Sequence, residues 1–398
     1  MTQIRNRTLF TSDNLPILRG MNSAAVDLVY LDPPFNSNKH YSAPVGSEAA
    51  GASFKDAWTL SDEDEAWHAA LKSHHPKLYA IIHAAGAVGG KGDKSYLIYM
   101  AIRILELPRL LRDTGSLYLH VDPTMSHSLK LVLDAIFGKR RFQNEFIWYY
   151  GGGGAGKKRW GRKHDVILFY SKSRRWIFNM DAVRAPHRWD AGQRRADGSQ
   201  RSLTKGKIPD DVFVHHSVMP WAKERMGYPT QKPLALLDRI IKASSNEGDT
   251  VLDPFCGCAT TCVSAEILHR NWIGIDISPK ALALVKKRMD KEVLGEGKVF
   301  KGRVIHRTDI PVRTDIPRIN ISRARMKKNL YGNQVGLCNG CGIHFPIQNF
   351  EIDHIVPIAE GGADMIENFQ LLCGSCNRIK GRRSMEYLKS RLIEKGNG

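Results

Sequence analysis

The sequence lacks any run of about 18 consecutive apolar residues, the length that a membrane-crossing helix requires. Its start also lacks the basic, apolar and small-residue pattern of a secretory signal peptide. Together these absences predict a cytoplasmic protein. Acidic residues are scarce relative to basic ones, 40 against 59, and the net charge is +19. This excess favours a partner with one negative charge per phosphate, a nucleic acid, although a solvated surface or an anionic membrane would also tolerate it.

Cysteine is rare, with seven in 398 residues, and an odd number does not suit a framework of disulfides. Four of the seven form two C-x-x-C pairs, Cys338 with Cys341 and Cys373 with Cys376. Two such thiolate pairs complete the tetrahedral ligand set of a structural Zn²⁺. A second group (Cys256, Cys258 and Cys262) has no fourth thiol nearby, so we expect these side chains to be buried as small hydrophobic groups.

The length predicts two domains, because single hydrophobic cores stop growing at roughly 250–300 residues. Helical and strand-like patterns alternate up to about residue 290, which predicts a doubly wound α/β fold. A basic, proline-punctuated stretch then contains the pentapeptide R-T-D-I-P at 307–311 and again at 313–317, and we interpret it as a linker. The expected division is an α/β domain over 1–298, a basic linker over 299–330 and a small domain over 331–398.

A candidate cofactor motif begins at Val251, where an apolar strand turns through Gly257 into a helix. Asp276 closes the next strand about 20 residues later, the spacing at which an acid holds ribose hydroxyls. A plain βαβ unit with a small-residue turn is the alternative. Asp253 lies in the turn, and a carboxylate there suits the cationic amino end of S-adenosylmethionine better than it suits a phosphate.

A candidate catalytic tetrapeptide, Asp32-Pro33-Pro34-Phe35, follows a short apolar strand. An exocyclic amino group of a base is a poor nucleophile, because its lone pair is delocalised into the ring. The Asp32 carboxylate and the Pro33 carbonyl can bind the two amino hydrogens and redirect that lone pair, while Phe35 offers a face for a base swung out of the duplex. Taken alone, the tetrapeptide could also be a simple proline turn.

These motifs resemble those of the DNA amino-methyltransferases, in the β-type order that places the tetrapeptide before the cofactor motif. The resemblance covers about residues 5–295 and includes the N-S-N-K sequence at 36–39. It implies a Rossmann-like methyltransferase sheet, S-adenosylmethionine as cofactor, double-stranded DNA as substrate and a homodimer. The D-P-P-F tetrapeptide favours the N6 atom of adenine over the N4 atom of cytosine.

The resemblance also assigns residues to the cofactor. In this family the motif is D-P-F-x-G-x-G-T-T, and the chain departs from it at Cys258 and at Ala259, which replaces the last glycine. We expect binding to survive, since alanine is accepted where a helix packs on a strand. The residues expected at the cofactor are Asp13, Lys232, Pro233, Asp253, Pro254, Phe255, Gly257, Thr260 and Asp276.

The segment 151–219 interrupts the alternation of helices and strands, and most of it, about 172–219, is predicted to be a target-recognition insertion. Arginines and lysines alternate with tryptophans over 156–207, a pattern suited to gripping phosphates and stacking on bases. A mobile basic loop is the alternative. The run Gly151–Gly154 is either a hinge for the entering base or a flexible join. The residues concerned are Lys157, Lys158, Arg159, Trp160, Arg162, Lys163, Arg174, Arg175, Trp176, Arg188, Trp189, Arg194, Arg195 and Arg201.

The last 60 or so residues resemble the HNH, or ββα-metal, nucleases. In that family a histidine deprotonates the attacking water and a divalent cation stabilises the leaving oxygen. The resemblance implies that His354 is the base, that Asp353 and Asn377 hold Mg²⁺ or a similar ion, and that Asn368 orients His354 or assists the metal. A zinc ribbon that only binds DNA is the alternative.

Together, the two halves predict a restriction-modification-like enzyme that methylates an adenine in DNA and cleaves DNA, in the nucleoid of a prokaryote or in a phage. A solitary methyltransferase with an idle, DNA-binding zinc module is the second hypothesis. An RNA-modifying enzyme is the third.

Overall fold

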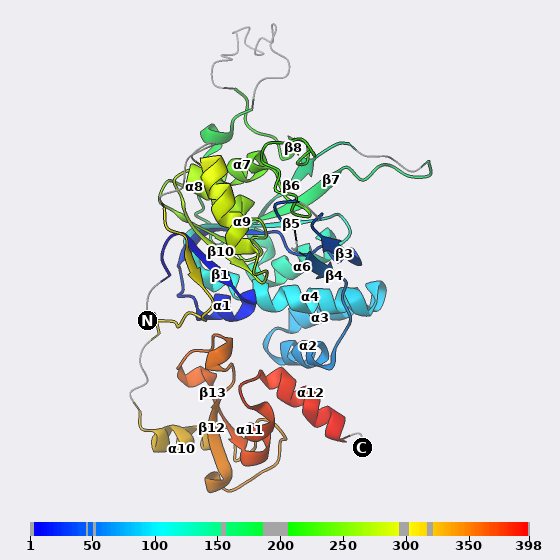
Figure 1. Cartoon of the computed structure of the whole chain (residues 1–398). Coiled ribbons are helices and arrows are strands. Elements are labelled where there is room, and N and C mark those ends of the chain that lie inside the picture. Colours follow the sequence, from blue (N-terminus) through cyan, green and yellow to red (C-terminus); the bar gives the residue numbers. More distant parts are fainter. Residues whose placement is uncertain are drawn as a thin grey trace, which may run out of the picture.

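A computed structural model of the chain describes residues 4–44, 47–50, 53–152, 157–185, 206–293, 302–316 and 321–396. Figure 1 shows a large α/β domain with a smaller module of α10 to α12, β12 and β13 below it. The predicted target-recognition residues Arg188, Trp189, Arg194, Arg195 and Arg201 lie outside the described part of the chain.

The large domain is built on a nine-stranded sheet in the order β11-β1-β10-β9-β2-β5-β7-β6-β8. Among these strands β7 alone runs against its neighbours, and all the others point the same way. The mostly parallel, doubly wound sheet confirms the predicted fold class. The strands are β1 (Thr8–Thr11), β2 (Val26–Leu31), β5 (Leu111–Val121), β6 (Phe142–Tyr149), β7 (His164–Ser171), β8 (Val212–Val214), β9 (Thr250–Asp253), β10 (Asn271–Asp276) and β11 (Ile305–Arg307).

Helices cover both faces of this sheet, as Figure 1 shows, and each face has its own apolar core. One core includes Ile17, Leu97 and Leu129, and the other includes Leu237, Val263 and Val285. Strand β2 is buried along its whole length, which explains its nearly continuous apolar sequence. The helices are α1 (Asn14–Gly20), α2 (Asp62–His74), α3 (Pro76–Gly89), α4 (Lys91–Ile104), α5 (Leu107–Leu110), α6 (Ser126–Phe137), α7 (Leu234–Ser244), α8 (Thr260–Ile267) and α9 (Ala281–Arg288).

One expected boundary is misplaced. The apolar spacing over 95–112 predicts a helix that ends at 113–115, but α4 ends at Ile104 and β5 already begins at Leu111. Pro108 opens the short helix α5, where a proline is tolerated in the first turn, and this separates the two elements. A small hairpin, β3 (Lys39–Ser42) with β4 (Ser53–Asp56), lies outside the main sheet.

The small module has the ββα arrangement that the HNH resemblance implies. Its antiparallel strands β12 (Phe350–His354) and β13 (Phe369–Cys373) are followed directly by α11 (Gly374–Lys380). Helices α10 (Arg323–Asn333) and α12 (Met385–Gly396) complete it. Its core includes Met326, Phe350, Leu371 and Leu388 and is separate from the two cores of the sheet.

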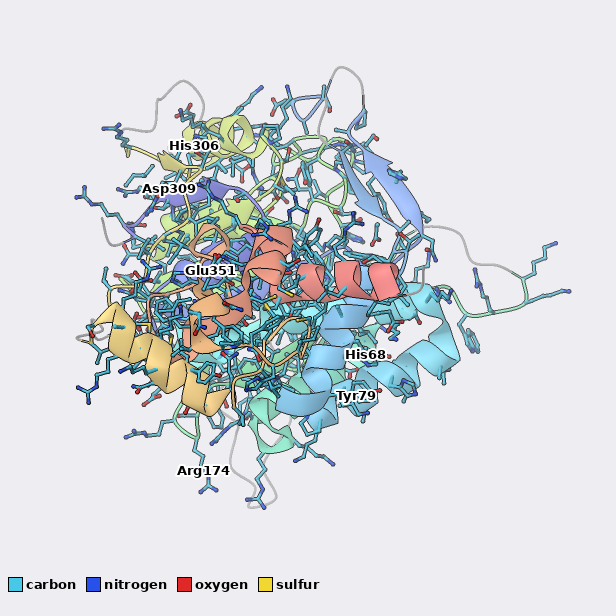
Figure 2. All side chains as sticks on the ribbon, turned by 90° about the horizontal axis from the view of Figure 1, so that it is seen from below. His68, Tyr79, Arg174, His306, Asp309 and Glu351 are labelled. Carbon is cyan, nitrogen blue, oxygen red and sulfur yellow. The ribbon has the colours of Figure 1, made fainter. Side chains whose placement is uncertain are left out.

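The module is attached to the large domain along α1 and α2. Helix α12 packs against α2, and Figure 2 shows these helices side by side, with His68 labelled on α2. Arg19 of α1 lies 3.7 Å from Glu360 of the module. A Cβ atom on Gly361, whose φ is +80°, would lie 2.1 Å from the Pro16 carbonyl oxygen, so only glycine permits this contact.

Two parts of the expected linker are described: residues 302–316 lie on the large domain, whereas 323–330 belong to α10 of the small module. Strand β11 pairs with β1 at the edge of the sheet. Each copy of R-T-D-I-P folds its arginine onto its own aspartate, Arg307 on Asp309 and Arg313 on Asp315. The second copy also contacts the turn after α1, where Asp315 accepts a hydrogen bond of 2.9 Å from the Ser23 N–H.

Candidate active sites and metal centre

A cavity of about 170 Å³ opens at the carboxyl edge of the sheet. Parallel strands end together at this edge, so β1, β2, β9 and β10 deliver their following residues to one place. The structure thereby unites the two motifs, which are over 200 residues apart in the sequence. The lining includes Asp13, Asp32, Pro33, Pro34, Phe35, Lys232, Asp253, Pro254, Phe255, Gly257, Thr260 and Asp276, but Pro233 does not line it.

Two carboxylates mark one end of the cavity, Asp253, which is buried, and Asp276, which is partly buried. Asp276 accepts hydrogen bonds from the N–H groups of Gly257 (2.8 Å) and Ser278 (2.7 Å), and burial raises its pKa. Burial raises the pKa of Asp253 to about 7, helped by the charges of Asp32 and Asp276 and opposed by hydrogen bonds from Thr261 and the Phe255 N–H. These acids, with backbone N–H groups beside them, fit a ligand that carries a cationic amine and hydroxyl groups.

The turn between these acids is held from behind by Arg288, a fully buried cation of α9. Its guanidinium donates to the Cys258 carbonyl (3.1 Å) and to Thr260 Oγ1 (2.7 Å). Ala259, where the family has glycine, has a φ of +61°, in the left-handed region that favours glycine. The family's glycine therefore suits this backbone conformation, a reason for glycine that is separate from the packing of the helix on the strand.

Helix α1 brings a second set of contacts to the cavity. Asp13 caps the helix by accepting a 2.8 Å hydrogen bond from the Leu15 N–H, and it pairs with Arg103 at 2.8 Å. Asn14 donates to the Pro254 carbonyl at 2.8 Å and accepts from Arg103 at 2.6 Å. Sequence reasoning missed Asn14 and Arg103, although Asn14 directly follows Asp13.

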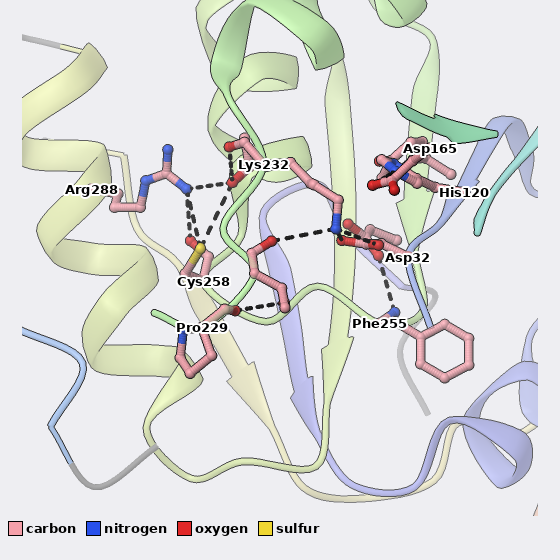
Figure 3. Close-up of polar contacts among 12 residues, drawn as sticks. Asp32, His120, Asp165, Pro229, Lys232, Phe255, Cys258 and Arg288 are labelled. Atoms are coloured by element: carbon pink, nitrogen blue, oxygen red, sulfur yellow. Dashed lines mark hydrogen bonds and ion pairs between the residues drawn. The ribbon is translucent and has the colours of Figure 1, made fainter. Parts of the chain in front are cut away.

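At the other end of the cavity, Lys232 is bound to Asp32 (Figure 3). Its ammonium donates to both carboxylate oxygens, at 2.8 and 2.7 Å, and lies 5.0 Å from the centre of the Phe35 ring. Lys232, which is expected at the cofactor, lines the same cavity as the cofactor motif. Its charge lies on the expected catalytic carboxylate and ring, and its backbone carbonyl accepts a hydrogen bond from Thr260.

Behind Phe35 lies a buried polar network that no motif revealed. The fully buried His120 ring stacks on Phe35 at 5.7 Å and is hydrogen-bonded to the Tyr30 hydroxyl (2.7 Å) and to Asp165 (3.0 Å). Burial raises the pKa of Asp165, but His120 and the charge of Lys232 outweigh burial and lower it overall. The alternating strand S-L-Y-L-H-V was the only sequence signal for His120.

The four C-terminal cysteines form a cluster with the geometry of a metal site. Their Sγ atoms all lie within 4.8 Å of one another, and Cys338 Sγ accepts a 3.2 Å hydrogen bond from the Cys373 N–H. Four thiols at this spacing fit a tetrahedral Zn²⁺. Cys256, Cys258 and Cys262 are buried, as expected, and the four-thiol group is the only such cluster in the described part of the chain.

The expected nuclease residues lie on β12 and the elements that follow it. His354 Nε2 lies 2.7 Å from Asp364, an acid that sequence analysis did not select. Asp353 is paired at 2.9 Å with Lys380, which is fully buried and also donates to the His354 carbonyl. The Asn377 amide donates to Glu351, which is labelled in Figure 2.

Asn368 contacts backbone rather than either of these side chains. Its amide donates to the carbonyls of Val356 and Ala363, at 2.9 Å each, and accepts from the Val356 N–H at 2.8 Å. These three bonds close the loop that follows His354. The contacts therefore fit an indirect orientation of His354 better than a role at the metal.

Comparisons with known proteins agree with both halves. Residues 26–287 match a family described as DNA methylase, and residues 338–383 match one described as HNH endonuclease. The type II methyltransferase M.HpaI of Haemophilus parainfluenzae is 27% identical, over 73% of this chain and 76% of its own. The DNA adenine methyltransferase YhdJ of Escherichia coli K12 is 27% identical, over 71% and 83%. A crystal structure of M1.HpyAVI with SAM covers 71% of this chain and 98% of its own, at 18% identity and a TM-score of 0.43.

Proposed function

The chain belongs to the N6/N4 family of DNA methylases and carries an HNH endonuclease domain, and from this we propose that it transfers a methyl group from S-adenosylmethionine to an exocyclic amino group in double-stranded DNA. The observation that carries the proposal is the shared cavity. Asp32 and Phe35 line one end of it, and Asp253 and Asp276 line the other.

We assign the binding of the cofactor to three acids of that cavity. Asp253 would pair with its amino group, Asp276 would accept from its ribose hydroxyls, and Asp13 would contact its adenine region. When bound, S-adenosylmethionine supplies a methyl group on a sulfonium, which is strongly electrophilic.

The protein's part in the transfer is to aim the amino nitrogen. Asp32 and the Pro33 carbonyl would accept the two amino hydrogens, and Phe35 would stack on the base. Lys232 donates to both oxygens of Asp32, and each oxygen keeps a second lone pair that can accept from the entering base. The His120 ring, stacked on Phe35, supports the Phe35 ring as the base enters.

Adenine N6 is the proposed target atom. The D-P-P-F tetrapeptide supports it, and one relative that covers most of this chain is named a DNA adenine methyltransferase. Single-molecule sequencing of DNA from a host that expresses the protein tests both the base and the site. Modified cytosines in place of modified adenines would overturn the choice of base but not the reaction.

For the C-terminal module we propose DNA cleavage, with His354 as the base and with Asp353 and Asn377 holding Mg²⁺. Plasmid is incubated with and without Mg²⁺ and cofactor, using the wild type, Asp32→Ala and His354→Ala. Cleavage that persists in His354→Ala refutes the nuclease assignment. Methyl incorporation that is unchanged in Asp32→Ala refutes the catalytic role of Asp32.

A second candidate for this module is DNA binding without cleavage. The buried ion pair between Lys380 and Asp353 favours it, because the cation already neutralises the carboxylate that a metal ion would need. Wild-type protein that binds plasmid but leaves it uncut with Mg²⁺ would support this candidate.

The proposed DNA substrate implies where the protein acts. We propose a cytoplasmic, nucleoid-associated protein of a prokaryote or phage, acting as a homodimer like the β-type enzymes that it resembles. Among the described residues, no helix is both long and apolar enough to cross a membrane.

A further inference from the structure

The connection between β6 and β7 leaves the sheet at the catalytic edge. Strand β6 runs parallel to β2 and β5, and β7 runs antiparallel to them, so Tyr149 and His164 lie at the edge where Asp32 follows β2. At the base of this connection, the Trp148 ring contacts His120 edge-on at 5.7 Å, and His120 stacks on Phe35. Two ring contacts thus join this connection to the catalytic aromatic.

The described part of the connection beyond its base, 157–163, is a basic arm with one aromatic residue. Its sequence, K-K-R-W-G-R-K, has five cations and no acid. Trp160 is 96% exposed. Figure 1 shows the arm projecting from the ends of β6 and β7, away from the body of the domain. A tryptophan so fully in water, among cations, fits a partner that offers both phosphates and flat apolar rings.

The reach of the arm suits a DNA duplex. Trp160 lies four positions before His164, the start of β7, and four extended residue steps span at most about 14 Å. That exceeds the depth of either groove of B-DNA, about 7.5–8.5 Å. Trp160 can therefore reach the base stack while the arm's cations contact the backbone.

We propose that Trp160 enters the space that the target base leaves in the duplex and stacks there, while Lys157, Lys158, Arg159 and Arg162 hold the adjacent phosphates. This inference rests on the proposed function, because a base that is methylated at its amino group must first leave the stack. Aromatic stacking against bases tolerates any sequence, so the role needs no particular recognition site.

The direct test is photocross-linking on a duplex that carries the mapped methylation site. The thymine opposite the target adenine is replaced by 5-iodouracil, or the opposite guanine by 6-thioguanine if the mapped base is cytosine. We expect a cross-link to the peptide that contains Trp160, and its loss in Trp160→Ala. A cross-link that maps to Trp221 instead, a residue 81% exposed in another loop, would overturn the proposal.

A second measurement reads base flipping in solution. With 2-aminopurine at the target position, its fluorescence rises as the base unstacks. Trp160→Ala should lower the equilibrium constant for flipping about 5- to 150-fold, the equivalent of about 1–3 kcal/mol at 1.36 kcal/mol per tenfold. Trp160→Phe should restore most of it. Equal flipping in the wild type and Trp160→Ala would leave the arm as a phosphate clamp and refute the stacking role. A wild type that incorporates no methyl group into DNA would refute the proposed function itself.

Discussion

Cofactor binding should release a proton from Asp253. Burial raises the pKa of this carboxyl to about 7 in the cofactor-free protein, so at pH 6 about nine-tenths of the molecules carry it protonated. The cationic amine of S-adenosylmethionine would require the ionised form. The affinity for S-adenosylmethionine should therefore fall about tenfold for each pH unit below 7 and level off above 7. Each tenfold step corresponds to about 1.4 kcal/mol of binding free energy.

The same shift has the opposite effect on the stability of the cofactor-free protein. An aspartate whose folded pKa is about 7, against 3.8 unfolded, favours folding while it is protonated. This contribution to the free energy of unfolding is fully present below about pH 4 and is lost as the pH rises to 7. The total loss is roughly 4 kcal/mol, at 1.36 kcal/mol per pKa unit. Cofactor binding should reverse the loss, so the cofactor should raise the melting temperature more at pH 7 than at pH 5.

Calorimetry measures the proton directly. Titrations at pH 6 in two buffers of different ionisation enthalpy should show about 0.9 proton released per cofactor bound. Asp253→Asn should bind more weakly and release none. 5′-Methylthioadenosine, which lacks the amine, serves as the control. Its affinity should not depend on the ionisation of Asp253. An affinity for S-adenosylmethionine that stays constant between pH 5 and 7, with no proton released, would refute the reasoning.

Four further changes follow from single contacts. Lys232→Met leaves the Asp32 carboxylate without its cation and should destabilise the protein by about 3–5 kcal/mol in urea unfolding; a loss below 1 kcal/mol would mean that the pair is mostly solvated. Ala259→Gly relieves a left-handed alanine and should raise the stability by about 1 kcal/mol, measured as a higher melting temperature with methylation intact. Asn368→Ala removes three hydrogen bonds and should destabilise the C-terminal module by about 2–4 kcal/mol, and retained cleavage would argue against a positioning role. Removing the metal with a chelator, or Cys376→Ser, should abolish bound zinc and expose 321–396 to protease, while Asp32-dependent methylation persists.

Much of the fold could be predicted from the sequence, because local patterns determine it. Strand β2 and the strand before Asp253 were recognisable from apolar runs that end in proline or glycine, and the C-x-x-C pairs from fixed spacing. The cavity could be inferred in outline, since the carboxyl ends of parallel strands meet at one edge.

The contacts within the site were beyond such patterns. Lys232 and Asp32 are 200 residues apart, and His120 and Asp165 are 45 apart, so each pair depends on which strands become neighbours. A lysine in a Q-K-P motif looks the same whether its charge faces a cofactor or a carboxylate. Only the packing of the loop before α7 against the end of β2 brings the lysine to the carboxylate.

Helix α1 connects the two modules, because it contacts both the cofactor cavity and the C-terminal module. Its N-cap Asp13 and first residue Asn14 line the cofactor cavity, and Arg19 near its other end lies 3.7 Å from Glu360, in the loop that follows β12 of the C-terminal module. Burial lowers the pKa of Arg19, while Glu106 and Glu360 oppose this effect. Arg19 thus lies between an acid of each module, 3.9 Å from Glu106 and 3.7 Å from Glu360. The second R-T-D-I-P copy is bound to the turn after this helix as well, because Ser23 donates to Asp315 and Thr314 donates to Asn22.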